Sequence, residues 1–222
     1  MTGKSLPKYL YVVFSQTPYK VGKMIRYVTK YEYNHASISF DKSLESLYSY
    51  ARYYEDTPLY GGFVKESLRR YQCKAVDSKL RVYEIPLTEK QAKAALMLID
   101  KYTREQDVHV YNFLSVFTAP FGKSVPITGS YTCIGFVCHF LTCLGLYRSK
   151  EGSPTFKCMS RNLRKYLIYE GYSQEYHIAK TWGHDSFPIK RAKHRGLIDT
   201  AKNINCMLRQ YRYDRYGSKK GT

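Results

Sequence analysis

An α+β fold, in which a small antiparallel sheet packs on helices, is predicted by three features of this chain. Short segments with strictly alternating polar and apolar residues, such as residues 35–41 and 80–85, indicate half-buried strands. Segments with apolar residues every three to four positions, such as residues 88–102 and 132–144, indicate helices that bury one face. The hydrophobic fraction of 44% is sufficient for one core, and 222 residues fit one domain with additions.

Strands are predicted for most of the first half of the chain. Residues 10–14 form an apolar run too short to cross a membrane, and residues 21–28, after a turn, have helical spacing. Residues 35–41 alternate, so that His35 begins a half-buried strand with its ring on the polar face. The segments that follow are a partner strand at residues 47–52, a loop through Pro58, Gly61 and Gly62, and a strand at residues 80–85.

Helices are predicted where capping signals coincide with apolar stripes. Thr88 and Gln91 have the spacing of a capping box, and the stripe that follows extends to Tyr102. Residues 132–144 have the same periodicity, and Gly145 is placed to end that helix. The other predicted elements are a short segment at residues 111–117, a helix at residues 160–170 capped by Gly171, and a strand at residues 175–179.

The chain is expected to form one domain without a membrane span. Residues 1–150 are predicted to be the core, and residues 151–222 a basic, tyrosine-rich extension that packs on the same domain. No apolar stretch reaches the roughly 18 residues of a membrane helix, and the N-terminus lacks a secretion signal. We therefore expect a cytoplasmic protein whose six cysteines are thiols rather than disulfides.

The charge of the chain predicts an anionic partner. Lysine and arginine number 36 against 18 acidic residues, a net charge of +18, and residues 190–222 carry a large part of the excess. Nucleic acid, anionic lipid and an acidic protein are all attracted by such a field, and a surface that only promotes solubility is the alternative. The tyrosines and arginines of residues 211–216 also suit base stacking and phosphate pairing, so a nucleic-acid-binding module stays open as the alternative function.

Cys133 is the best candidate for a nucleophile because it falls in the first turn of its predicted helix. Unpaired backbone N–H groups and the positive end of the helix dipole favour a thiolate there. The same N–H groups are able to hold the oxyanion that forms when a thiolate attacks a carbonyl carbon. Cys133, Cys138 and Cys143 recur at a spacing that diverges around a helix, so we predict neither a metal site nor a cofactor.

His35 is the best candidate for the base that serves this thiol. It begins a strand whose other face is apolar, so a rigid element directs its ring. His139 lies on the predicted helix of Cys133, at a spacing that points away from it. The remaining histidines lie in polar or basic segments without such a scaffold: His109, His177, His184 and His194.

Three separated segments carry these residues in a particular order: residues 33–52 with His35, residues 61–66, and residues 131–137 with Cys133. In this order they resemble the permuted papain-like hydrolases of the NlpC and lecithin-retinol acyltransferase branch, in which the histidine strand precedes the cysteine helix. The resemblance covers roughly residues 9–147, and Ile134 departs from it because many relatives carry a small or polar residue there. It implies a circularly permuted papain-like fold with Cys133 as nucleophile and His35 as base.

The resemblance also implies a third polar residue on the strand beside His35, which holds the imidazole in the correct tautomer. Ser49 is predicted for this role if the turn between the two strands has an odd number of residues. An even turn leaves Asp41, Glu45 and Tyr48 as the candidates.

A cysteine-nucleophile enzyme follows as the expected function. Cys133 is expected to attack an amide, ester or thioester carbonyl, and His35 to transfer the protons. Water as the second substrate gives a peptidase-like or amidase-like hydrolase, and an amine gives an acyltransferase. The expected partners are an acyl or peptidyl substrate and, because of the basic surface, an acidic carrier protein that presents a thioester.

Overall fold

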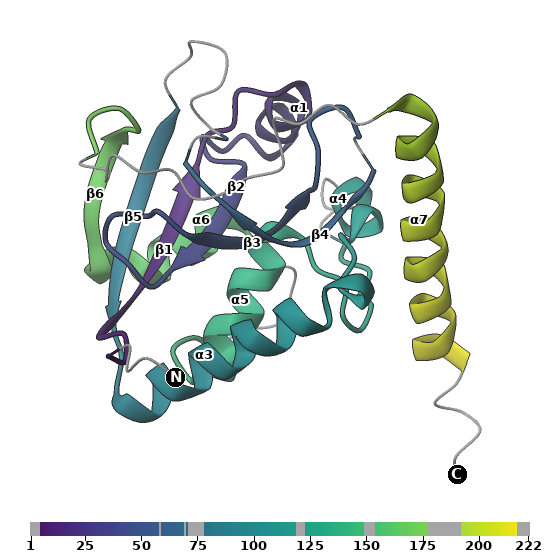
Figure 1. The fold of residues 1–222 in the computed structure, drawn as a ribbon. Coiled ribbons are helices and arrows are strands. Elements are labelled where there is room, and N and C mark those ends of the chain that lie inside the picture. The colour runs from purple at the N-terminus through teal and green to yellow at the C-terminus, as the bar shows by residue number, and fades with distance from the viewer. Residues whose placement is uncertain are drawn as a thin grey trace.

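The fold is built on one antiparallel sheet, shown with its helices in Figure 1. The structure is a computed structural model that describes residues 5–57, 59–68, 70, 78–118, 123–148, 154–176 and 192–216. Within these residues six strands pair in the order β4-β3-β2-β1-β5-β6, so the predicted α+β class with an antiparallel sheet is confirmed. The strands are β1 (Tyr9–Ser15), β2 (His35–Ser39), β3 (Leu47–Arg52), β4 (Gly61–Glu66), β5 (Lys79–Pro86) and β6 (Leu167–Tyr172).

Strand β1 lies in the interior of the sheet because its side chains are apolar on both faces. It pairs with β2 on one side and with β5 on the other. Leu10, Val12 and Phe14 face the main core, whereas Tyr11 and Val13 face a second, smaller core on the opposite side of the sheet. All five side chains are buried, so both faces of the sheet are covered along this strand.

The two helices with capping signals occupy their predicted positions. Helix α3 (Glu89–Arg104) begins with the complete capping box of Thr88 and Gln91. Helix α5 (Cys133–Cys143) packs on β2 and β3 and contributes its apolar side chains to the main core. Gly145, which follows its C-cap, has the positive φ of 68° that glycine adopts without strain. The remaining helices are α1 (Lys20–Thr29), η1 (Gln106–Val108), α4 (Phe113–Thr118), α6 (Phe156–Leu163), η3 (Arg164–Tyr166) and α7 (Lys193–Tyr216).

The loop predicted through Gly61 and Gly62 is instead the beginning of strand β4. The backbone at residue 109 runs against this strand, and the N–H of Phe63 donates to the carbonyl of His109 at 3.0 Å. A Cβ on Gly62 would lie 2.1 Å from the same carbonyl oxygen, so no larger residue fits. The glycine therefore permits a close backbone approach rather than a turn. Pro58 lies outside the described residues.

The helix predicted at residues 160–170 is wrong beyond Tyr166, where the short helix η3 ends. Residues 167–172 form strand β6, which extends the sheet beside β5. Glu170 forms an ion pair with Arg81 across this pairing. The edge of β5 offers unpaired backbone groups, and satisfying them outweighs the helical spacing of the local sequence. Glu175 lies in a turn rather than in the predicted strand, and residues 177–179 lie outside the described part of the chain.

Helix α7 was not predicted, because the sequence there is notable for its charge rather than for an apolar stripe. Figure 1 shows it along one edge of the molecule, near α4 and β4. The amide of Asn203 donates to the carbonyl of Gly61 at 2.7 Å, and Met207 is buried against Val110 and Ile127. No helix among the described residues is both long enough and apolar enough to cross a membrane.

Candidate active site

Cys133 is the first residue of α5, as the sequence predicts. Thr132 caps the helix, and its hydroxyl oxygen accepts a hydrogen bond from the N–H of Gly135 at 3.1 Å. The Cys133 side chain is buried, and its sulfur lies 4.0 Å from the carbonyl oxygen of Asn34, the residue before β2. The first turn of α5 therefore holds the thiol against the beginning of the strand that carries His35.

His35 is the first residue of β2, and its ring lies close enough to Cys133 for the two side chains to interact electrostatically. Its Nε2 atom lies 2.8 Å from Oε1 of Glu66, the last residue of β4. Because Nε2 is occupied by the carboxylate, Nδ1 is the ring nitrogen left to exchange a proton with the thiol. The three side chains thus form a continuous series from Cys133 through His35 to Glu66.

Glu66 is held from a second side by Arg70. The side chains of both residues are buried, and Nη1 of Arg70 lies 3.1 Å from Oε2 of Glu66. The same guanidinium donates to the carbonyl oxygen of Arg52 at 3.2 Å. A buried carboxylate is tolerated only when it is paired and hydrogen-bonded. Arg70 therefore supplies a countercharge for the Glu66 carboxylate beside the imidazole.

The electrostatics of this series determine the protonation state of His35. Burial by itself lowers the pKa of a histidine, because it disfavours the charged ring. The negative charge of Glu66 and the hydrogen bonds to Cys133 and Glu66 outweigh burial and raise the pKa of His35 to about 10. His35 is consequently an imidazolium at neutral pH. This changes the expected order of proton transfer, because His35 already holds a proton before any substrate reacts.

The structure does not bring Ser49 to the histidine ring. The pairing of Ile38 with Tyr48 places Ser49 on the same face of the sheet as His35, which is the arrangement expected for an odd turn. The hydroxyl of Ser49 is buried but has no hydrogen-bond partner among the described residues. The residue that binds Nε2 of the ring is Glu66. In the structure the polar partner of the ring is therefore Glu66 and not Ser49.

The other residues considered for the third position are engaged elsewhere. The carboxylate of Asp41 accepts hydrogen bonds from the hydroxyl of Ser43 at 2.5 Å and from the backbone N–H of Glu45 at 3.1 Å. Tyr48 stacks on Phe63 on the main-core side of the sheet. Glu66 was not predicted as a site residue, although residues 61–66 are one of the segments that carry the family resemblance. Only the folded sheet brings Glu66 beside a histidine 31 positions away in the sequence.

Tyr111, which precedes α4, is a further site residue that the sequence did not indicate. Its hydroxyl contacts both the sulfur and the backbone N–H of Cys133. Burial, reinforced by the charge and hydrogen bond of Cys133, raises the pKa of Tyr111 well above its ordinary value. The backbone N–H of Tyr111 donates to the carbonyl of Gly61 at 2.9 Å, which ties it to β4. A neutral phenol is thereby positioned at the sulfur and the start of α5.

Comparison with known proteins assigns no family to this arrangement. The chain matches no protein-family model, no curated protein and no solved structure. The chemistry of the site is therefore argued from its own side chains.

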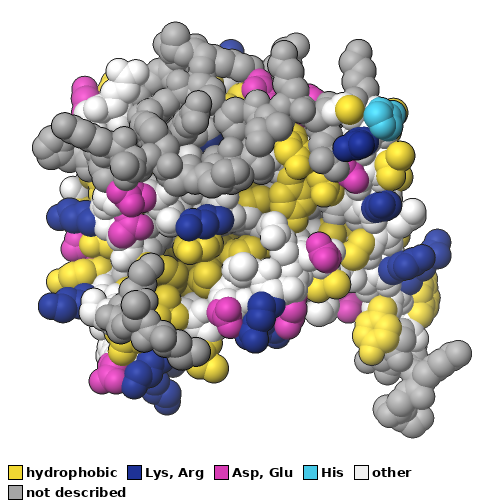
Figure 2. Space-filling view, viewed as in Figure 1, with side chains coloured by type: hydrophobic (Ala, Val, Ile, Leu, Met, Phe, Trp, Pro, Cys, Tyr) yellow, Lys and Arg dark blue, Asp and Glu magenta, His cyan; other side chains and the backbone are white. Residues whose placement is uncertain are grey.

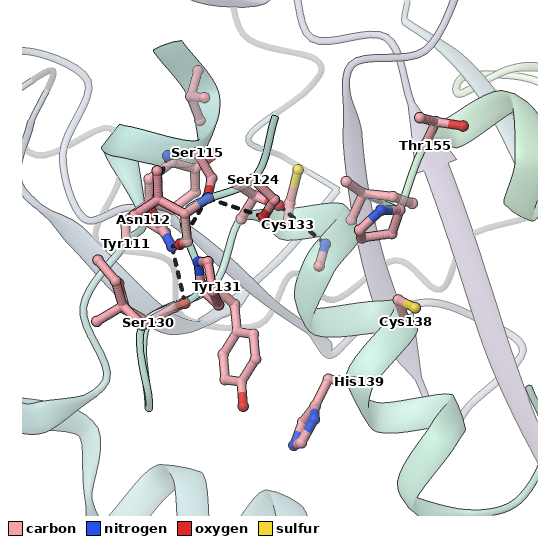
Figure 3. A pocket seen from close by; sticks show the side chains of 18 of the residues that line it. Tyr111, Asn112, Ser115, Ser124, Ser130, Tyr131, Cys133, Cys138, His139 and Thr155 are labelled. Atoms are coloured by element: carbon pink, nitrogen blue, oxygen red, sulfur yellow. Dashed lines mark hydrogen bonds between the residues drawn. The ribbon is translucent and has the colours of Figure 1, made fainter. Parts of the chain in front are cut away.

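A cavity of about 1530 Å³ opens beside Cys133. Figure 3 shows Cys133 at the first turn of α5, with Cys138 and His139 farther along the same helix. The wall of the cavity is mostly apolar, and it includes Ile134 of α5 and Phe156 of α6. A cavity of this size and character is able to hold a sizeable apolar group next to a reactive sulfur.

The remaining histidines and cysteines that the structure describes do not form a metal site. The described residues contain no group of three or more His, Cys, Asp or Glu side chains able to hold a metal ion. His139 lies 3.5 Å from the exposed thiol of Cys143, and His109 contacts the carbonyl of Gly129 at 3.2 Å. The cysteines in the described part of the chain are free thiols: Cys133, Cys138, Cys143, Cys158 and Cys206. Cys73, His177 and His184 lie outside it.

Proposed function

We propose that the protein is a cysteine-nucleophile enzyme that forms an acyl-enzyme on Cys133, with His35 as proton carrier and Glu66 as its positioning residue. The observation that carries this proposal is the buried series in which His35 interacts electrostatically with Cys133 and lies 2.8 Å from Glu66. The order of the chain, with the histidine strand before the cysteine helix, supports a permuted papain-like arrangement of these parts. We also place the enzyme in the cytoplasm, where thiols stay reduced.

The first half of the reaction transfers an acyl group to sulfur. The thiolate of Cys133 attacks the carbonyl carbon of an amide, ester or thioester, and the carbonyl oxygen becomes an oxyanion. The His35 imidazolium, charged at neutral pH, then donates its proton to the leaving group as the bond to the carbonyl carbon breaks. The products of this half-reaction are a thioester on Cys133 and a neutral imidazole.

The second half of the reaction releases the acyl group. Neutral His35 accepts a proton from the incoming water or amine, whose oxygen or nitrogen attacks the thioester carbonyl. Cleavage of the carbon–sulfur bond restores the thiolate and leaves His35 protonated. Water yields a hydrolase and an amine yields an acyltransferase, and both classes use the same first step.

The oxyanion has two groups available to stabilise it. The backbone N–H of Cys133 lies in the first turn of α5, at the positive end of the helix dipole, where the helix itself supplies no acceptor for it. The hydroxyl of Tyr111 contacts the same N–H and the sulfur, and its raised pKa keeps it a neutral donor. Donors fixed in a largely dry site stabilise developing negative charge better than water does.

The substrate class follows from the cavity beside the nucleophile. A mostly apolar wall around about 1530 Å³ favours an acyl or peptidyl group with a substantial apolar portion. An acidic carrier protein that presents such a group as a thioester stays part of the proposal, because the chain carries a net charge of +18.

The experiment that tests the proposed function follows the reactivity of individual thiols by intact mass and peptide mapping. With iodoacetamide near neutral pH, we expect the buried Cys133 to be alkylated about tenfold faster than the exposed Cys143. His35→Ala should slow the labelling of Cys133, whereas the matched change His139→Ala, beside Cys143, should not. Incubation with a panel of acyl thioesters should add one acyl group to Cys133.

Turnover provides the second arm of this test. Cys133→Ala should leave the circular dichroism spectrum unchanged and reduce thioester turnover by about a thousandfold or more. A Cys133→Ala variant that keeps more than about a tenth of the wild-type rate would falsify the proposal. Labelling of Cys143 ahead of Cys133, with no effect of His35→Ala, contradicts it independently.

A further inference from the structure

The outward face of α7 combines basic and apolar side chains. Figure 2 shows dark blue and yellow side chains interspersed down the right-hand edge of the molecule, where α7 lies. The basic residues on this face are all exposed: Arg195, Lys202, Arg209, Arg212 and Arg215. The apolar side chains among them are Leu197, Ile198, Leu208, Tyr213 and Tyr216, with exposed fractions of 73%, 51%, 37%, 75% and 63%.

The acidic residues of α7 do not neutralise this face. Asp214 turns toward the body of the protein, where its carboxylate accepts a hydrogen bond from the backbone N–H of Thr128 at 2.7 Å. Asp199, the other acidic residue of the helix, is half-buried. Among the described residues, none of the five basic side chains on the face forms an ion pair. The outward face therefore carries an excess of positive charge.

The rest of α7 explains why this face points outward. Asn203, Met207 and Gln210 recur every three to four residues and contact the body of the protein. The amide of Gln210 donates to the carbonyl of Val108 at 2.6 Å. The helix is thus anchored by one stripe, and the basic and apolar side chains occupy the opposite side along its whole length.

We propose that the outward face of α7 binds the surface of an anionic lipid bilayer. Arginine and lysine pair with anionic headgroups, while Leu197, Ile198 and Leu208 insert between the acyl chains that begin just below them. Tyr213 and Tyr216 suit the headgroup level, where tyrosine is enriched. Helix α7 lies on the membrane in this arrangement and does not cross it.

The exposed aliphatic side chains distinguish a bilayer from other anionic partners. A nucleic-acid backbone offers phosphates to the basic residues but no apolar region for Leu197 and Ile198. A second copy of the chain would bring two faces with an excess of positive charge together, which is unfavourable. A bilayer with anionic headgroups satisfies both kinds of side chain at once.

Helix α7 borders the cavity of the candidate active site, so docking through α7 would also position this cavity relative to the membrane. Tyr213 and Asp214, near the end of the helix, line the same cavity as Cys133. A protein docked through α7 would thus hold the edge of this cavity near the headgroups. The docking itself does not depend on the chemistry of Cys133, so either proposal can fail without the other.

The test measures sedimentation of the full chain with lipid vesicles at low salt. We expect binding to mixed phosphatidylcholine and phosphatidylglycerol vesicles, little binding to phosphatidylcholine alone, and release at high salt. The triple change Arg195→Glu, Arg209→Glu and Arg212→Glu should weaken binding about tenfold or more. A matched control reverses three exposed basic residues elsewhere, Lys8→Glu, Lys90→Glu and Lys165→Glu, and should stay within about twofold of wild type.

A second variant separates insertion from simple charge attraction and guards against misfolding of the first. Leu197→Ser with Ile198→Ser keeps every charge and should still weaken vesicle binding about threefold or more. Circular dichroism of each variant verifies that α7 is retained. The proposal is overturned if the α7 reversal and the control reversal weaken binding equally, if the serine variant binds as wild type, or if duplex DNA or RNA is bound more tightly than the mixed vesicles.

Discussion

At the scale of single residues, the site depends on one buried carboxylate more than on any other side chain. Cys133 and His35 are recognisable from the sequence by their places at the start of a helix and of a strand. The protonation state of His35 depends on Glu66, because the charge of this carboxylate outweighs the effect of burial on the pKa of His35. Arg70 in turn keeps that carboxylate paired. The reactivity of the thiol is thus set by residues that do not touch it.

Separate substitutions of Glu66 and Ser49, the two candidates for the third site residue, test whether the Glu66 carboxylate controls the reactivity of the thiol. Glu66→Gln keeps an oxygen and a nitrogen near the ring but removes the negative charge, so we expect the alkylation rate of Cys133 near neutral pH to fall about tenfold and its pH profile to shift. Ser49→Ala is the matched control and should stay within about twofold of wild type, because the Ser49 hydroxyl has no partner among the described residues. The opposite pattern, with Ser49 sensitive and Glu66 not, returns the third position to Ser49.

The raised pKa of His35 also predicts a pH dependence of stability. The unfolded chain releases this proton near pH 6.5, whereas the folded protein retains it up to about pH 10. The contribution to stability is therefore complete below pH 6.5 and is lost as the pH rises through about 10. In urea unfolding over this range, wild type should lose at least about 1 kcal/mol more than His35→Gln. Equal losses in both proteins show that the ring is not a buried imidazolium.

At the scale of elements, the site lies where three of them meet. The start of α5 supplies Cys133, the start of β2 supplies His35, and the end of β4 supplies Glu66. The close packing of the backbone at Gly62 also ties β4 to the segment that carries Tyr111. A substitution at Gly62 thus affects two groups near the thiol of Cys133, namely the carboxylate of Glu66 and the phenol of Tyr111.

At the scale of the whole molecule, the region after residue 150 belongs to the same sheet and core as the region before it. Strand β6 pairs with β5, and Phe156, Met159 and Leu163 of α6 are buried in the main core beside side chains of β1. The same region supplies the outward face of α7. The C-terminal part of the chain therefore contributes both to the stability of the fold and to a basic exposed surface.

Two truncations separate these contributions. A chain of residues 1–150 lacks α6 and β6, and each large buried side chain lost costs roughly 2–5 kcal/mol, so their sum is comparable to the stability of a whole domain. We expect no cooperative thermal unfolding for it. A chain of residues 1–176 retains both elements and should unfold cooperatively but lose vesicle binding together with α7. Cooperative melting of residues 1–150 near the wild-type temperature contradicts this account.

The sequence by itself determined the elements whose signals are local. Alternation predicts β2 and β5, the capping box of Thr88 and Gln91 predicts α3, and the apolar period with Gly145 predicts α5. These signals arise within one element, because each depends on side-chain periodicity or on a cap a few residues away. They were sufficient to place Cys133 and His35 at the start of their elements.

Only the tertiary structure decided the pairings between distant segments. Glu66 reaches His35 across 31 positions, and residues 167–172 become a strand because the edge of β5 is available to them. Neither outcome is encoded in local periodicity, since both depend on which backbone groups and charges remain unsatisfied after the rest of the sheet has formed. The partner of the His35 ring and the last strand were therefore among the features that sequence reasoning did not place.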